Sequence, residues 1–147
     1  MTQPPLFAEP TTELIVCTDG GARGNPGPAA IGVSICNTDG DEVDAVAQTI
    51  GEATNNVAEY TAVIVGLRRA AELGARAVEV RSDSMLLVEQ LNGRYKVRKD
   101  HLKLLVADAR AAASAFEQVR FVHVRREQNT RADALVNEAL DAEGGWE

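Results

Sequence analysis

Four acidic residues occupy positions where a sheet and its helices commonly place reactive groups: Asp19, Glu59, Asp83 and Asp133. The first ends an apolar run, the third follows another in Ser-Asp-Ser, and the other two fall early in predicted helices. Carboxylates that gather without histidine or cysteine favour hard divalent ions such as Mg²⁺ or Mn²⁺. Asp19 and Asp83 meet only if their strands are adjacent and parallel, which the sequence leaves open. Each acid alone is equally suited to a strand end or a helix cap.

Two polar segments accompany these acids. Residues 18–29 read TDGGARGNPGPA, which suits either close approach of a sugar-phosphate backbone or a tight hairpin connection. This segment is not a P-loop, because it lacks the terminal Gly-Lys-Ser/Thr and leads into a strand. Residues 53–60 read ATNNVAEY. Thr54 or Asn55 caps a helix there, and the second asparagine is free to donate to a base edge or a hydroxyl.

Hydrophobic periodicity places these segments on a chain of strands and helices. Short apolar or alternating runs bounded by turn residues predict strands at 13–18, 29–36, 42–50, 77–81 and 119–124. Apolar residues at helical spacing predict helices at 56–71, 84–91, 101–116 and 130–142. Three successive strands followed by strands alternating with helices indicate one α/β domain, in which a single mixed sheet carries the helices.

The predicted domain spans residues 13–142, between a flexible proline-rich leader at 1–12 and an acidic tail at 143–147. No apolar stretch approaches the roughly 18 residues of a membrane span, and the N-terminus lacks a secretory signal. We therefore expect a cytoplasmic protein without membrane contacts. We also expect it to act as a monomer. Cys17 and Cys36 lie in apolar runs, which favours reduced thiols over a zinc site and leaves a cross-strand disulfide open under oxidation.

The net charge of −7 argues at first against a nucleic-acid partner, because phosphate binding requires basic residues. The charge is unevenly distributed, however. Residues 94–131 carry ten basic and four acidic side chains. Within this stretch, the run NGRYKVRKDHLK at 92–103 is the best candidate for phosphate contacts, with a solvated helix start as the alternative.

Four separated motifs together resemble type 1 ribonuclease H, in the compact form found in archaea and actinobacteria. The resemblance covers about residues 14–140 and rests on TDGGARGNPGPA at 18–29, TNNVAEY at 54–60, SDS at 82–84 and QNTRAD at 128–133. It implies the ribonuclease H-like fold. In that fold a three-strand antiparallel meander and further parallel strands form a five-stranded mixed sheet, which helices flank.

The resemblance also implies an activity. Asp19, Glu59, Asp83 and Asp133 match the family's metal-binding carboxylates, which would hold two Mg²⁺ or Mn²⁺ ions. The expected reaction is endonucleolytic hydrolysis of the RNA strand of an RNA·DNA hybrid, leaving 5′-phosphate and 3′-hydroxyl ends. Two alternatives are a non-catalytic hybrid-binding module and another nuclease of the same superfamily.

Residues expected to contact the hybrid come from the same motifs and from the basic stretch. Asn25, Asn55 and Asn56 match positions that read the minor groove, where 2′-hydroxyls distinguish RNA from DNA. Thr54 with Asn25 would also hold a phosphate of the DNA strand. The full predicted set is Gly20, Gly21, Asn25, Thr54, Asn55, Asn56, Ser84, Arg94, Lys96, Arg98, Lys99, Arg125, Arg126 and Asn129.

The sequence departs from many bacterial members of the family in three places. Met85 stands where they have a glutamine that contacts a base; either that base contact is missing or displaced, or Met85 is a core residue. Arg125 or Arg126 stands near the place of a loop histidine, and each is either a phosphate contact or a surface arginine. The long basic protrusion is absent, which leaves the run at 92–103 as its substitute.

Overall fold

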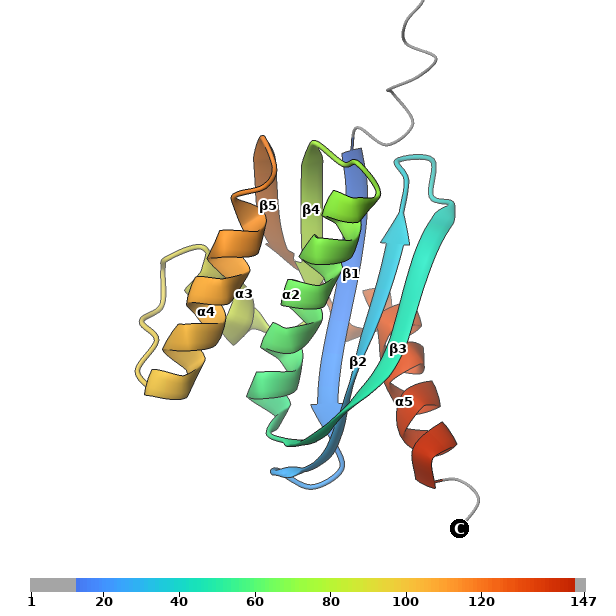
Figure 1. Ribbon diagram of the computed structural model, residues 1–147, viewed down its shortest axis with the longest axis vertical. Coiled ribbons are helices and arrows are strands. Elements are labelled where there is room, and N and C mark those ends of the chain that lie inside the picture. Colours follow the sequence, from blue (N-terminus) through green and yellow to red (C-terminus); the bar gives the residue numbers. More distant parts are fainter. Residues whose placement is uncertain (1–12, 145–147) are drawn as a thin grey trace, which may run out of the picture.

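The computed structural model describes residues 13–144, and a five-stranded mixed sheet forms its centre (Figure 1). The strands lie in the order β3-β2-β1-β4-β5. β1, β2 and β3 form an antiparallel meander, whereas β4 and β5 run parallel to β1. This topology confirms the predicted fold class. The strands are β1 Glu13–Ala22, β2 Gly27–Cys36, β3 Glu42–Ala53, β4 Ala77–Ser82 and β5 Gln118–His123.

Helices cover both faces of the sheet. α2 and α4 lie side by side on one face, and α5 packs on the opposite face against β1, β2 and β3 (Figure 1). Side chains of β2 point alternately to the two faces of the sheet. Ile31 and Val33 belong to the main core, whereas Ala30 packs with Val136 of α5 on the other face. The helices are α2 Asn55–Glu72, α3 Met85–Leu91, α4 Asp100–Ala113 and α5 Thr130–Gly144.

Several elements extend further than predicted, among them β1 and α5. β1 continues to Ala22, which pairs with Ala29 of β2, so the glycine-rich segment is mostly strand and its turn is short. Asp19 consequently lies inside a strand, which corrects its predicted place at a strand end. α5 continues to Gly144, so the predicted tail begins within the helix. Residues 1–12 and 145–147 lie outside the described residues.

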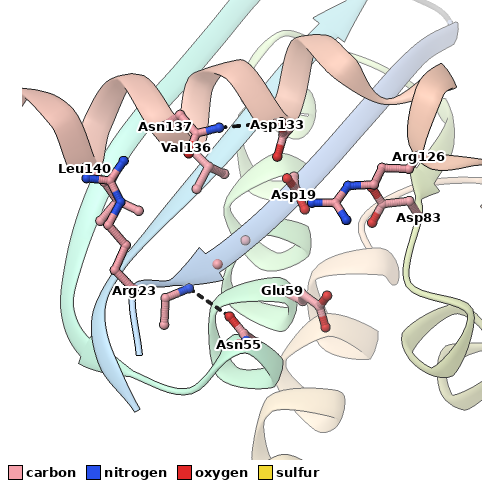
Figure 2. A pocket seen from close by; sticks show the side chains of 13 residues that line it. Asp19, Arg23, Asn55, Glu59, Asp83, Arg126, Asp133, Val136, Asn137 and Leu140 are labelled. Carbon is pink, nitrogen blue, oxygen red and sulfur yellow. Dashed lines mark hydrogen bonds between the residues drawn. The ribbon is translucent and has the colours of Figure 1, made fainter. Parts of the chain in front are cut away.

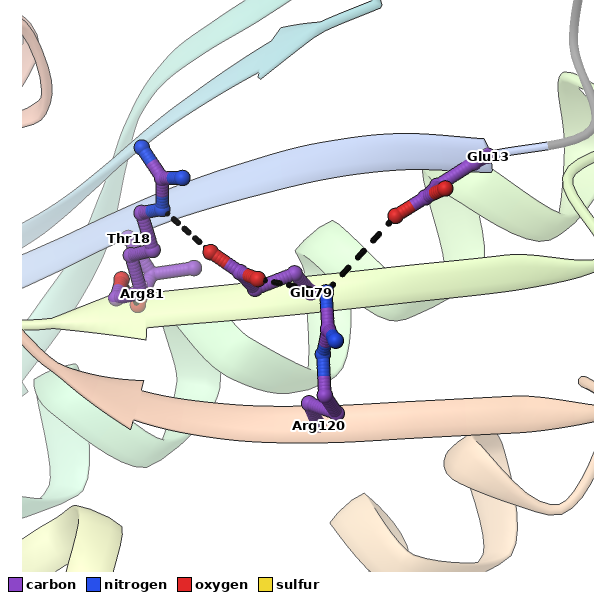
Figure 3. Close-up of polar contacts among 5 residues, drawn as sticks. All are labelled: Glu13, Thr18, Glu79, Arg81 and Arg120. Atoms are coloured by element: carbon purple, nitrogen blue, oxygen red, sulfur yellow. Dashed lines mark hydrogen bonds and ion pairs between the residues drawn. The ribbon is translucent and has the colours of Figure 1, made fainter. Parts of the chain in front are cut away.

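Polar contacts join β1, β4 and β5 on the face turned away from α2 (Figure 3). Arg81 and Arg120 both pair with Glu79, at 2.6 and 2.7 Å, and Arg120 also lies 3.7 Å from Glu13. Closer to the strand ends, and on the face that α2 covers, the hydroxyl of Thr18 donates to the carbonyl of Arg81 at 3.2 Å. This bond secures β1 to β4 one residue before Asp19 and two residues before Asp83.

Two further predictions concern the cysteines and membranes. Cys17 and Cys36 are both free thiols and half-buried, and in the β1–β2 register Cys36 faces Ile15 rather than Cys17. Burial raises the pKa of the Cys17 thiol, which lowers its reactivity. Among residues 13–144 no helix has the length and hydrophobicity needed to cross a bilayer.

Candidate active site

Asp19 and Asp83 lie next to each other because their strands are parallel neighbours. Cys17 of β1 pairs with Arg81 of β4, and continuing this register by two residues brings Asp19 beside Asp83. Asp83 itself follows the last residue of β4, where the chain leaves the sheet toward α3. The adjacency that the sequence left open is thus present in the structure.

Glu59 reaches the same place from the second turn of α2. The hydroxyl of Thr54 caps this helix by accepting a hydrogen bond from the amide of Val57 at 3.2 Å. α2 then crosses β1 at Gly20, where an added Cβ would lie 2.3 Å from the carbonyl carbon and oxygen of Ala58. Because Gly20 has no side chain, the backbone of α2 can approach β1 closely at this point. The approach brings Glu59 near Asp19.

Asp133 approaches from the other face of the sheet, in the first turn of α5. Here Gly32 of β2 allows the close contact, since a Cβ would lie 2.2 Å from the carbonyl oxygen of Ala132. The side-chain amide of Asn129 donates to the carbonyl of Thr18 at 3.0 Å and joins the start of α5 to β1. Asn137, one turn further along the helix, lies 3.5 Å from the Asp133 carboxylate.

All four carboxylates line one pocket of about 460 Å³ (Figure 2). Its walls come from the end of β1 and the turn after it, the first two turns of α2, the segment that follows β4, and the first three turns of α5 with the residues just before them. The pocket also contains two guanidinium groups, those of Arg23 and Arg126. The lining residues include Gly20, Gly21, Ala22, Asn55, Val136, Asn137 and Leu140.

The carboxylates destabilise one another's charged forms. Burial raises the pKa of Asp19 to about 7, and the charge of Asp83 and a hydrogen bond shared with Asp133 act in the same direction. Burial and the charge of Asp83 likewise raise the pKa of Glu59 to about 7, while a hydrogen bond from Ser84 partly opposes this shift. Near neutral pH this cluster is therefore poised to bind either protons or cations.

The chemistry of the donor set fits divalent cations. Four carboxylate side chains line one pocket, and its lining contains neither histidine nor cysteine. A set of ligands made of oxygen atoms alone favours Mg²⁺ or Mn²⁺. Within residues 13–144 no three side chains of aspartate, glutamate, histidine or cysteine lie close enough together to coordinate one metal ion as they stand. Binding would therefore draw these mutually repelling carboxylates together around the ions.

The predicted asparagines interlock the glycine-rich turn with the start of α2. The side-chain oxygen of Asn25 accepts from the amide of Asn55 at 3.0 Å, and the side-chain oxygen of Asn55 accepts from the amide of Ala22 at 2.8 Å. Asn55 lines the pocket, and within residues 13–144 no acceptor occupies its side-chain NH2 group, which leaves both donors for a ligand. Asn56 is half-buried and lies outside the pocket lining.

Two predictions about individual residues need correction. The motif predicts that Asn129 contacts substrate, but this residue is only 2% exposed. Its side chain bonds the start of α5 to β1 instead of reaching a ligand. The core alternative for Met85 is wrong, since this residue is 51% exposed at the first position of α3. Ser84 caps α3 by accepting from the amide of Leu87 at 3.3 Å and lies against Glu59, which places it at the site's edge.

The basic run forms the exposed connection between α3 and α4. Arg94 is paired with Glu89 at 2.7 Å, whereas Lys96, Arg98 and Lys99 have no carboxylate within ion-pair distance among the described residues. Gln90 holds this connection to the core, since its side-chain amide donates to the carbonyl of Lys96 at 3.3 Å and its side-chain oxygen accepts from the Tyr60 hydroxyl at 2.5 Å.

Of the two candidate arginines before α5, one lines the pocket and the other does not. Arg126 lines the pocket, and in Figure 2 its side chain extends toward the carboxylates. Arg125 is outside the lining and highly exposed, with Glu127 at 3.9 Å. Sequence reasoning missed Arg23 and Asn137, which also line the pocket. For Arg23 the only signal was a basic residue within the glycine-rich segment.

Comparisons with known proteins agree with this geometry. A family model described as "Reverse transcriptase-like" matches residues 17–139. The bifunctional protein Rv2228c of Mycobacterium tuberculosis is 47% identical over 131 residues, which are 88% of this chain and 36% of that protein. The chain thus spans about a third of the length of this relative.

Two solved structures are similar over nearly their whole length. Ribonuclease H1 of the archaeon Halobacterium salinarum superposes with a TM-score of 0.87 at 43% identity, covering 88% of this chain and 98% of that one. LC11 ribonuclease H1, solved in complex with an RNA/DNA hybrid, superposes with a TM-score of 0.85 at 46% identity, covering 88% and 98%.

Proposed function

The chain belongs to the ribonuclease H family, in its compact type 1 form, and on that basis we propose that it hydrolyses the RNA strand of RNA·DNA hybrids. The observation that supports this proposal most directly is the convergence of Asp19, Glu59, Asp83 and Asp133 on one pocket. The cut is endonucleolytic and leaves a 5′-phosphate and a 3′-hydroxyl.

The four carboxylates are the groups that would hold two divalent cations. When bound, such ions supply activation of a water molecule and stabilisation of the leaving oxygen in an in-line displacement. The chain's own contribution is to hold the acids on rigid elements and to orient the hybrid. Asn55, whose side-chain NH2 group has no acceptor among the described residues, would bond a 2′-hydroxyl or a base edge.

A cleavage assay with labelled duplexes tests this function. RNA·DNA, RNA·RNA and DNA·DNA duplexes of one sequence are incubated with Mg²⁺ or Mn²⁺, and the fragment ends are mapped. We expect cleavage of the RNA in the hybrid alone, with phosphate at the 5′ ends. Binding of the hybrid without any cleavage would instead identify a hybrid-binding module, and cleavage of DNA would identify another nuclease activity.

Magnesium should stabilise the folded protein, because it relieves repulsion among the pocket carboxylates. At a Mg²⁺ concentration ten times its Kd, binding contributes about 1.4 kcal/mol, which raises the Tm of a chain this size by about 4 °C. Thermal unfolding with Mg²⁺, compared with NaCl of equal ionic strength, measures this shift. An unchanged Tm at millimolar Mg²⁺ would contradict the assigned cation site.

The basic side chains between α3 and α4 that have no ion-pair partner among the described residues should contribute to hybrid affinity without taking part in the chemistry. Replacing Lys96, Arg98 and Lys99 with alanine is expected to raise KM about tenfold and leave kcat unchanged. The dependence of log KM on log salt should flatten by about 0.9 for each phosphate that these side chains neutralise in the wild type. Arg68→Ala, which removes an exposed charge from α2, is the control. A salt dependence equal to that of the wild type would refute phosphate binding by this connection.

A further inference from the structure

Arg23 stands at the rim of the carboxylate pocket without a role in the proposed chemistry. It occupies the turn after β1 and lines the pocket together with Gly21, Ala22 and Leu140. Figure 2 shows Arg23 and Arg126 on opposite sides of Asp19. The centre of the pocket is therefore acidic, and each flank carries a guanidinium group.

This arrangement matches the charge pattern of a nucleic-acid strand crossing the pocket. Cations bound at the carboxylates can neutralise only the phosphate placed directly over them. The neighbouring phosphates of the same strand would lie near the acidic wall and would need positive partners of their own. A guanidinium is the group best suited to this task, because its planar donors match two phosphate oxygens at once.

In the structure Arg23 is held by an acid that does not line the pocket. Its Nη2 atom donates to Asp141 of α5 at 2.6 Å, and the two side chains are 50% and 67% exposed. Exposed ion pairs of this kind are weak, so a phosphate can replace the carboxylate. The guanidinium has five N–H donors, and within residues 13–144 it forms no other side-chain hydrogen bond.

We propose that Arg23 binds a backbone phosphate of the cleaved strand next to the scissile one, and that Asp141 competes with this phosphate for the guanidinium. The inference rests on the proposed function, since it assumes that a hybrid occupies the carboxylate pocket. Asp141 acts as a positioning residue: it orients Arg23 at the pocket rim in the free protein and lowers the affinity for the hybrid.

Binding measurements on the full chain test both parts. The Asp19→Asn variant, which we expect to bind without cutting, is titrated with a fluorescent RNA·DNA hybrid at several salt concentrations. Adding Arg23→Ala should weaken binding about fivefold and reduce the salt slope by about 0.9. Adding Asp141→Asn should tighten binding two- to threefold, and it should have no effect once Arg23 is alanine.

Glu138→Gln provides the matched control, because it removes the same charge from an exposed position on the same helix. Equal tightening by Asp141→Asn and Glu138→Gln would show a general charge effect and overturn the competition. An unchanged affinity and salt slope in Arg23→Ala, with a lower Tm, would show a structural ion pair only. Failure of the proposed function looks different, because the wild-type chain would then not cleave the hybrid at all.

Discussion

Asp19→Asn should reduce kcat on an RNA·DNA hybrid by more than about 1,000-fold, equivalent to about 4 kcal/mol of lost transition-state stabilisation. Asp19 is the acid at the centre of the cluster, since it interacts with both Asp83 and Asp133. An amide keeps the shape of the side chain but cannot supply the charge that holds a divalent cation. Steady-state cleavage of a labelled hybrid measures the loss, and Asp108→Asn, an exposed acid on α4, is the control.

The same variant should be more stable than the wild type in the absence of divalent ions. The pKa of Asp19 rises from its ordinary value near 4 to about 7 in the folded protein, so the folded state holds the proton more tightly than the unfolded state. Its contribution to stability is therefore lost as the pH increases from about 4 to 7. Glu59 acts in the same direction.

Thermal unfolding in EDTA at pH 5 and pH 8 tests whether the carboxylate cluster destabilises the folded protein as the pH rises. At pH 8 Asp19→Asn should unfold at a Tm several degrees above that of the wild type, and at pH 5 the two should differ less. Saturating Mg²⁺ should raise the Tm of the wild type more than that of the variant. A variant that is less stable than the wild type at pH 8 would contradict the repulsion inferred for the cluster.

Gly20→Ala should damage both stability and catalysis, because its new methyl group would overlap the backbone of α2. The Cβ would lie 2.3 Å from the carbonyl carbon of Ala58 and 2.6 Å from the amide nitrogen of Glu59. Neither atom belongs to a flexible side chain, so the helix must move away from β1. We expect a loss of about 3 kcal/mol in the free energy of unfolding, at the upper end of overpacking effects.

The neighbouring glycine provides a matched control. An added Cβ at Gly21 meets only the Val136 side chain at 3.8 Å and the Asn55 side chain at 4.0 Å, which are ordinary contacts. Gly21→Ala should therefore unfold like the wild type, while Gly20→Ala has a lower Tm and a lower kcat as Glu59 moves away from Asp19. Equal effects of the two substitutions on Tm would contradict the close approach of α2 to β1.

Local sequence patterns are enough to predict the strands, the helices and the four candidate acids. Strand and helix patterns depend on the local spacing of apolar side chains, so every predicted strand and helix is present with shifted ends. The four acids were recognisable because each lies in a distinctive motif, as with Asp83 in Ser-Asp-Ser. β1 was predicted too short because its last residues are glycine and alanine, which form strand there only by pairing with β2.

The way in which these residues come together depends on the packing of segments that are distant in the chain. The side-by-side placement of Asp19 and Asp83 depends on the parallel pairing of β1 with β4, whose residues are about sixty positions apart in the chain. The motif predicts Asn129 as a substrate contact, yet this residue is buried, and its side chain forms a hydrogen bond to β1. Arg23 resembled an ordinary turn residue, and only the packing of α5 places it at the pocket rim beside Asp141. Local spacing cannot encode such contacts, because they arise when distant segments pack together.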